Sequence, residues 1–155
     1  MAELNLWRED HQGGNNKLYN VLKAYANYDN EVGYVQGMNY IVGIMLFYIG
    51  DEEQVFWCLI KLMQQRDWRN VYTNDFPKLE TMTSILEERM AQELPRIHSH
   101  LESNFMDVGG LFTAHFMTLF VYLAPIEIST RLFEIFIFDG DNALIRVLLK
   151  MITIK

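Results

Sequence analysis

The residues best suited to chemistry in this chain form the run Gly33–Asn39, which reads GYVQGMN. Two glycines flank Gln36 at the point where one predicted helix ends and the next begins. Glycine tolerates positive φ and lets a partner approach the backbone closely, and backbone N–H groups at a helix start attract phosphate. A glutamine held at such a place can orient a water molecule beside a phosphate. The run therefore predicts phosphate chemistry on a partner molecule.

Other candidate chemistry in the sequence is weaker. No nucleotide-binding fingerprint occurs, so any nucleotide is expected to belong to the partner, and no cofactor is expected. His98 and His100 lie two residues apart, and two imidazoles at that spacing do not share a helix face, so no metal site is expected. For Gln36 itself, the residues alone leave an alternative open, in which the glycines serve a tight turn and Gln36 caps a helix.

Length and composition indicate one globular domain of 155 residues, with 50% hydrophobic residues and a net charge of −7. An acidic surface argues against nucleic acid and against a polybasic membrane patch. The single cysteine, Cys58, excludes an intrachain disulfide and indicates a reducing compartment, and we expect its side chain to be buried. The apolar stretches Ile41–Ile49 and Leu111–Ile128 are expected to be buried helices and not membrane spans.

Helical spacing dominates the apolar pattern, which predicts an all-α fold of about eight helices in a single domain. Four stripes carry this prediction: Leu18–Tyr28, Val55–Met63, Leu79–Met90 and Leu144–Met151. The aromatic residues of the stripes and of the later apolar stretch are expected in the core, among them Tyr19, Tyr25, Phe116 and Phe120.

The residues between the stripes agree with the prediction of an all-α fold. Asp51 and Gln54 have the spacing of a capping box, and Pro77 and Pro125 suit the first turn of a helix. Arg131 lies four residues after Glu127 and three before Glu134, which predicts a structural ion pair on a helix. Loops are predicted at three glycine- or asparagine-rich places: 13–16, 27–33 and 108–110.

The two ends of the sequence are abrupt. The last helical stripe is still running at Lys155 with no capping residue after it, and the apolar residues within Leu4–Trp7 are expected to dock on the core. We therefore expect a multi-helix domain that is shortened at both ends.

Six motifs in register resemble the TBC domain family, the GTPase-activating domains for Rab-type small GTPases. The resemblance runs from about Trp7 to Met151. Its carriers are LYNVLKAY at 18–25, DNEVGYVQGMN at 29–39, Phe56-Trp57, LPRIHSHL at 94–101, Leu119-Phe120 with Pro125, and RLFE at 131–134 with Asp139-Gly140. Any one of these motifs alone is weak evidence, whereas six in register over most of the chain are strong evidence.

The resemblance implies a two-residue mechanism that acts in trans on a GTP-bound Rab-type GTPase. In this family an arginine from I-x-x-D-x-x-R and the glutamine of Y-x-Q-G both enter the GTPase active site. An arginine supplied in trans is worth roughly 10³ to 10⁵ in rate. Gln36 is then the catalytic glutamine, and the expected partner-binding residues are Gly33, Tyr34, Gly37 and Asn39. The implied setting is cytoplasmic vesicle trafficking, with peripheral endomembrane association through the partner.

One departure from the family pattern leaves two functional predictions open. The motif I-x-x-D-x-x-R does not occur in the sequence, and Arg8 is followed by Asp10 where the motif has its acid first. Arg8 is therefore expected to be a solvated loop residue, and the domain at 1–155 lacks the arginine segment. Two readings follow: a GTPase-activating domain that uses Gln36, or a TBC-like scaffold or binding module without catalysis.

Overall fold

The computed structural model describes residues 13–153, and within that range it is all-α, with no strand. Eight α-helices and one 3₁₀ helix make up the described part, which confirms the predicted fold class. In chain order they are α1 (Gly13–Tyr28), α2 (Met38–Ile49), α3 (Glu52–Gln65), η2 (Trp68–Val71), α4 (Pro77–Glu93), α5 (Pro95–Ser103), α6 (Val108–Met117), α7 (Ile126–Asp139) and α8 (Asp141–Thr153).

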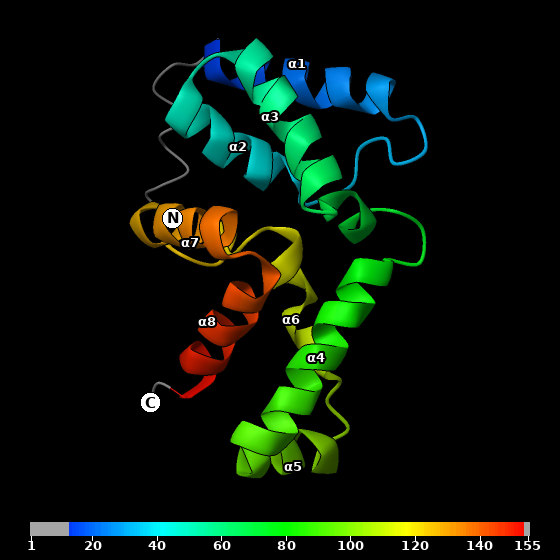
Figure 1. Ribbon diagram of the computed structural model, residues 1–155, viewed down its shortest axis with the longest axis vertical. Helices are drawn as coiled ribbons and strands as arrows, with labels where there is room; N and C mark the ends of the chain where they lie inside the picture. Colours follow the sequence, from blue (N-terminus) through cyan, green and yellow to red (C-terminus); the bar gives the residue numbers. More distant parts are fainter. Residues whose placement is uncertain (1–12, 154–155) are drawn as a thin grey trace.

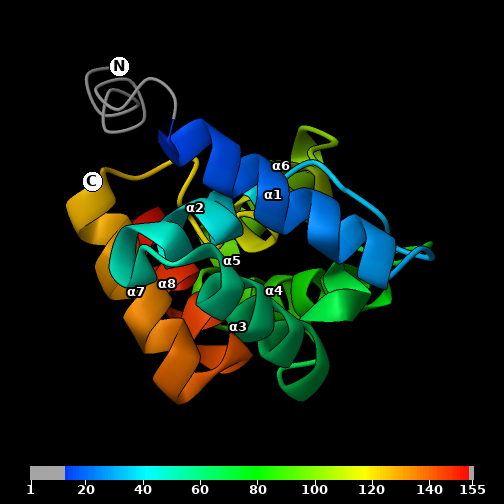
Figure 2. The ribbon, with the colours of Figure 1, turned by 90° about the horizontal axis from the view of Figure 1, so that it is seen from above.

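The helices form two groups along the long axis of the molecule (Figure 1). Helices α1, α2 and α3 pack on one another at one end. Helix α4 leads away from η2, contacts α6 and α8, and meets α5 at the far end. Figure 2 looks down on the α1–α3 group, with the later helices beneath it. The loop between α1 and α2 thus belongs to the first group.

The core is built by the apolar stripes that the sequence predicted. In α4, Leu79, Met82, Leu86 and Met90 are all buried, so the whole predicted stripe faces inward. Four of the five stripe residues of α3 are buried as well: Val55, Leu59, Leu62 and Met63. In α8 the stripe is buried at Leu144 and Leu148 and exposed at its last residue, Met151. Amphipathic spacing therefore located these helices and most of their buried faces.

Helix starts follow local hydrogen bonding and proline geometry. Asp51 is the N-cap of α3, and its Oδ1 accepts a hydrogen bond from the N–H of Gln54 at 2.9 Å, as the capping spacing predicted. Pro77 is the first residue of α4. Pro125 lies one residue before α7, at its N-cap. A proline is tolerated there because the first N–H groups of a helix have no partner inside the helix.

Two of the three predicted loops are wrong. Residues 13–16 form the first turn of α1, and 108–110 form the first turn of α6. At α6 the reason is visible, because the Asp107 carboxylate accepts a hydrogen bond from the N–H of Gly110 and caps the helix. Such a cap compensates for the low helix propensity of two glycines.

Three burial predictions are also wrong. Cys58 and Tyr19 are exposed, because both lie on outward faces of their helices, α3 and α1. The stretch Leu111–Ile128 is divided among the end of α6, a turn and the start of α7, whereas Ile41–Ile49 lies within the largely buried α2. Leu4–Trp7 and Arg8 lie outside the described residues. Within residues 13–153, no helix is both long enough and apolar enough to cross a membrane.

Candidate functional site

The loop between α1 and α2 presents Gln36 at its exposed end, one residue before a buried glycine. Gly37 has φ 109° and ψ −30° and immediately precedes α2, while Gly33 has φ 63°. Both glycines have positive φ, a backbone conformation that other residues rarely adopt. The two glycines therefore bend the chain on either side of Gln36, as the sequence predicted, and leave the glutamine side chain in solvent.

Gly37 also lies in close contact with the end of α6. A Cβ atom at Gly37 would lie 3.4 Å from the carbonyl oxygen of Met117. That carbonyl accepts a hydrogen bond from the hydroxyl of buried Tyr72 at 2.6 Å. Gly37 therefore packs against a backbone segment that the Tyr72 hydroxyl holds in place. This packing limits the backbone positions available to the neighbouring Gln36.

Hydrogen bonds inside the loop use three of the predicted partner-binding residues, Tyr34, Gly37 and Asn39. Asn39 Oδ1 accepts from the N–H of Gly37 at 3.3 Å and lies 3.5 Å from the hydroxyl of Tyr34. The N–H of Val35 points to Met38 Sδ at 3.3 Å. The oxygen of the Asn39 amide is therefore engaged within the loop, while the Tyr34 ring is 55% exposed.

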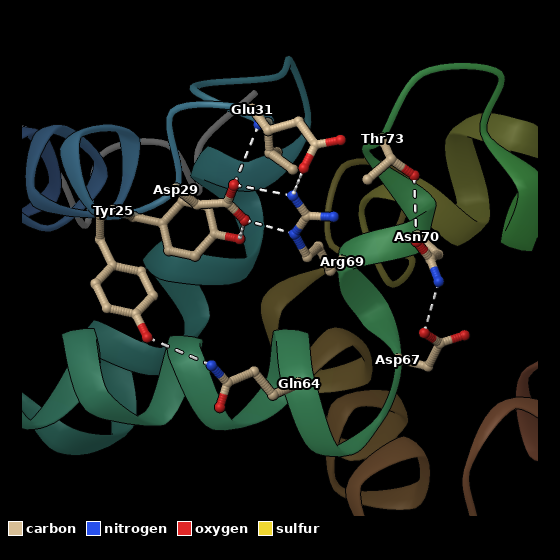
Figure 3. Close-up of polar contacts among 10 residues, drawn as sticks. Tyr25, Asp29, Glu31, Gln64, Asp67, Arg69, Asn70 and Thr73 are labelled. Atoms are coloured by element: carbon tan, nitrogen blue, oxygen red, sulfur yellow. Dashed lines mark hydrogen bonds and ion pairs between the residues drawn. The ribbon is translucent and has the colours of Figure 1, made fainter.

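On its other side the loop is held by a charge pair that the sequence analysis missed (Figure 3). Asp29 accepts from the N–H of Val32 through its side chain and from the N–H of Gly33 through its carbonyl, at 3.3 and 2.8 Å. Its carboxylate is in turn bound by Arg69 of η2, with Nε–Oδ2 at 2.7 Å and Nη2–Oδ1 at 3.0 Å. Arg69 Nη2 also reaches Glu31 at 2.6 Å.

The electrostatics of this pair favour its charged form. The hydrogen bond from Arg69 holds the pKa of the Asp29 carboxyl below its ordinary value, and partial burial opposes that shift. Tyr25 donates to Asp29 at 3.2 Å, and burial with the nearby carboxylate raises the pKa of the Tyr25 phenol. Asp29 and Arg69 are 40 residues apart, so no local pattern could have paired them.

The arrangement offers the exposed amide of Gln36 on a braced loop. A cavity of about 470 Å³ lies between α2, α3 and α7 and contains none of the predicted site residues. No cluster of three or more metal-ligating side chains is found within residues 13–153. Chemically, the loop can hold an amide against a surface that a second molecule brings to it.

The remaining polar candidates are structural pairs. Arg131 Nη1 lies 2.8 Å from Glu134 Oε2, which confirms the predicted ion pair on α7. His98 and His100 lie on α5, at the opposite end of the molecule from α2 (Figure 1). His98 Nδ1 lies 3.4 Å from Glu102 Oε2, so its neighbour is a carboxylate of its own helix.

Comparison with known proteins identifies the family to which this chain belongs. The family model described as Rab-GTPase-TBC domain matches residues 5–155, nearly the whole chain. The chain belongs to the Rab-GTPase-TBC domain family. The family resemblance seen in the motifs at 18–25 and 29–39 is thereby confirmed.

A solved structure and curated relatives agree with the TBC assignment. The crystal structure of the Chlamydomonas flagellar RabGAP TBC domain matches with a TM-score of 0.75 and 32% identity, over 87% of this chain and 44% of that one. The human Ecotropic viral integration site 5 protein homolog is 33% identical over 94% of this chain and 18% of its own length. The Rab GTPase-activating protein eat-17 of Caenorhabditis elegans is 32% identical over 85% of this chain and 15% of its own length.

Proposed function

We propose that this TBC domain activates GTP hydrolysis by a Rab-type small GTPase, with Gln36 acting in trans. The observation that carries the proposal is an exposed Gln36 on a loop braced by Asp29–Arg69 on one side and by Met117 on the other. In a TBC-family chain with this geometry, the glutamine side chain is available to a partner. The braced loop also loses little conformational entropy when the partner binds.

The proposed chemistry is phosphoryl transfer to water on GTP held by the partner. The carbonyl oxygen of the Gln36 amide accepts a hydrogen bond from the attacking water and its NH₂ group donates to a phosphate oxygen. Orientation of this kind lowers the barrier because the water no longer loses its freedom at the moment of reaction. Gly37 and Gly33 let the backbone approach the partner, Tyr34 contacts it, and Asn39 holds the loop in place.

Charge that builds on the phosphate needs a second group. In related phosphoryl transfers an arginine supplied in trans contributes roughly 10³ to 10⁵ in rate. No I-x-x-D-x-x-R motif occurs in the 155 residues. We therefore propose that Gln36 alone gives weak activation and that a longer version, extended to include an arginine segment, gives strong activation.

The missing motif also favours a second candidate, a TBC-like scaffold or binding module. Such a module would bind the GTP-bound GTPase through the same loop without accelerating hydrolysis. In either case we propose a cytoplasmic role in vesicle trafficking, with peripheral endomembrane association through the partner.

Single-turnover GTP hydrolysis over a panel of Rab-type GTPases separates the two candidates. The panel is run with this chain and with a version extended at both ends. Acceleration of at least one GTPase, stronger with the extended version, supports the activating domain. Binding to the GTP-bound form with an unchanged hydrolysis rate in both versions supports the binding module. A panel with neither binding nor acceleration would contradict both.

A further inference from the structure

Three tyrosines from separate segments meet beside the Gln36 loop. Tyr34 comes from the loop, Tyr40 from the first turn of α2, and Tyr122 from the turn between α6 and α7. The rings of Tyr40 and Tyr122 pack edge to face with centroids 5.3 Å apart. Tyr34 and Tyr122 are 55% and 60% exposed. Two large rings are therefore presented to solvent on the same side of the protein as the glutamine loop.

The turn after α6 places Tyr122 on this surface. Leu119 and Phe120 are fully buried and have φ of 48° and 65°, a conformation that non-glycine residues adopt at an energetic cost. Their burial anchors the turn, and the bend directs Tyr122 and Leu123 outward, where both are exposed. We call Tyr34, Tyr40, Tyr122 and Leu123 the tyrosine face.

The pKa of Tyr40 agrees with this clustering. Partial burial raises the pKa of the Tyr40 phenol, and the nearby phenols of Tyr122 and Tyr34 raise it further. The phenols of Tyr34 and Tyr122 therefore both lie close to the Tyr40 phenol.

The segments that build the tyrosine face carry no charge. Neither 33–50 nor 108–126 contains Asp, Glu, Lys or Arg, in a chain with 21% charged residues and a net charge of −7. The fully buried core of a protein interface is depleted in charged residues and enriched in tyrosine, because such surfaces desolvate at low cost. The uncharged aromatic surface next to Gln36 has that composition.

We propose that the tyrosine face is the docking surface for the GTPase segments that the γ-phosphate orders, and that it supplies affinity while Gln36 supplies rate. The inference rests on the proposed function, because the occupant follows from the position of Gln36. A glutamine that reaches GTP brings the adjoining surface against the protein around that nucleotide. Since those segments are ordered in the GTP state and released after hydrolysis, docking on this face favours the GTP-bound partner.

The test is a binding measurement with this chain and a panel of Rab-type GTPases, each loaded with a non-hydrolysable GTP analogue or with GDP. Tyr122→Ala is expected to weaken binding to the GTP-analogue form about 30-fold, the effect of losing an aromatic hot spot. Tyr122→Phe keeps the ring and is expected to bind within a few-fold of the parent. The matched control is Tyr19→Ala on α1, which removes a tyrosine that is likewise 60% exposed and is expected to change nothing.

The outcomes separate the docking surface from the proposed function. If the parent chain binds a GTPase and both Tyr122→Ala and Leu123→Ser bind equally well, the tyrosine face is not the docking surface, and the proposed function stands. If the parent binds no GTPase of the panel, the proposed function fails and the docking surface fails with it. Equal affinity of the parent for the GTP-analogue and GDP forms would also overturn the docking surface as proposed. Circular dichroism of each variant checks that the helices remain folded.

Discussion

Residue 37 shows most clearly why the loop needs glycine. Its φ of 109° lies outside the range that other residues adopt readily, and a Cβ there would meet the Met117 carbonyl at 3.4 Å. Gly33 differs, because its φ of 63° lies in the left-handed region that asparagine tolerates, and nothing lies within 4 Å of a Cβ at that position.

We therefore predict that Gly37→Ala lowers the free energy of unfolding by about 1–3 kcal/mol, because the backbone must adopt a strained conformation. Gly33→Asn, the matched control, should lower it by well under about 1 kcal/mol. Urea denaturation of the two variants measures the difference. Equal losses would show that the φ of 109° at Gly37 is no more demanding than the φ of 63° at Gly33, and would contradict the prediction.

Arg69 is expected to matter far more than an ordinary surface arginine. Its pair with Asp29 is partly buried and doubly hydrogen-bonded, and Asp29 in turn holds the backbone of the loop. Arg69→Ala should lower the free energy of unfolding by about 1.5–3 kcal/mol. Arg89→Ala, which breaks the more exposed pair with Glu93 on α4, should lower it by only about 0.3–0.5 kcal/mol. Matching losses in the two variants would refute a bracing role for Arg69.

The same pair predicts an acid-sensitive stability. The pKa of Asp29 is lower in the folded chain than its ordinary value of 3.8, so the folded state binds fewer protons in this range than the unfolded state. The stabilisation is complete above the ordinary pKa and is lost as pH falls through the folded pKa. Urea denaturation between pH 7 and pH 3 should show a smaller loss in Arg69→Ala than in the parent, and identical profiles would contradict the assignment.

At the residue scale, the sequence could locate Gln36 and its glycines but not what holds them. The glycine spacing predicts a bend wherever it occurs, because the requirement for positive φ is local. The contacts Asp29–Arg69 and Gly37–Met117 join residues that are far apart in the chain. No periodicity records such pairs, so only the folded chain reveals them.

At the scale of helices, local signals predicted α3 and α4 well because each has a complete apolar stripe and a defined start. Helix α6 was missed at its start, because Gly109 and Gly110 disfavour a helix intrinsically. The Asp107 cap that overrides this preference acts through one hydrogen bond. Tyr19 was misplaced for a related reason, since aromatic character alone does not tell which face of a helix is buried.

Helix α3 offers a direct test of capping. Asp51→Ala removes the side-chain acceptor for the N–H of Gln54 and should lower the free energy of unfolding by about 1 kcal/mol. Asp51→Asn keeps an acceptor oxygen and should stay close to the parent. Thermal or urea unfolding of both variants measures the difference, and an unchanged Asp51→Ala would show that α3 does not depend on this cap.

At the scale of the whole molecule, the fold brings two distant segments to one loop, beside the helix that precedes it. Helix α1 supplies Tyr25, η2 supplies Arg69, and the end of α6 supplies Met117. Apolar periodicity predicted an all-α fold, but it carries no information on which helices become neighbours. The site is thus a product of packing, although the motif that marks it is local.

The proposed function requires that Gln36 raises the hydrolysis rate of a bound GTPase. Its most direct test is single-turnover hydrolysis with Gln36→Ala at a saturating concentration of the domain, on any GTPase that the parent accelerates. Exposed Gln54→Ala on α3 serves as the control. We predict that Gln36→Ala loses most of the acceleration that the parent gives, with unchanged affinity for the GTP-analogue form and no loss for Gln54→Ala. A Gln36→Ala domain that accelerates hydrolysis as well as the parent would contradict the account.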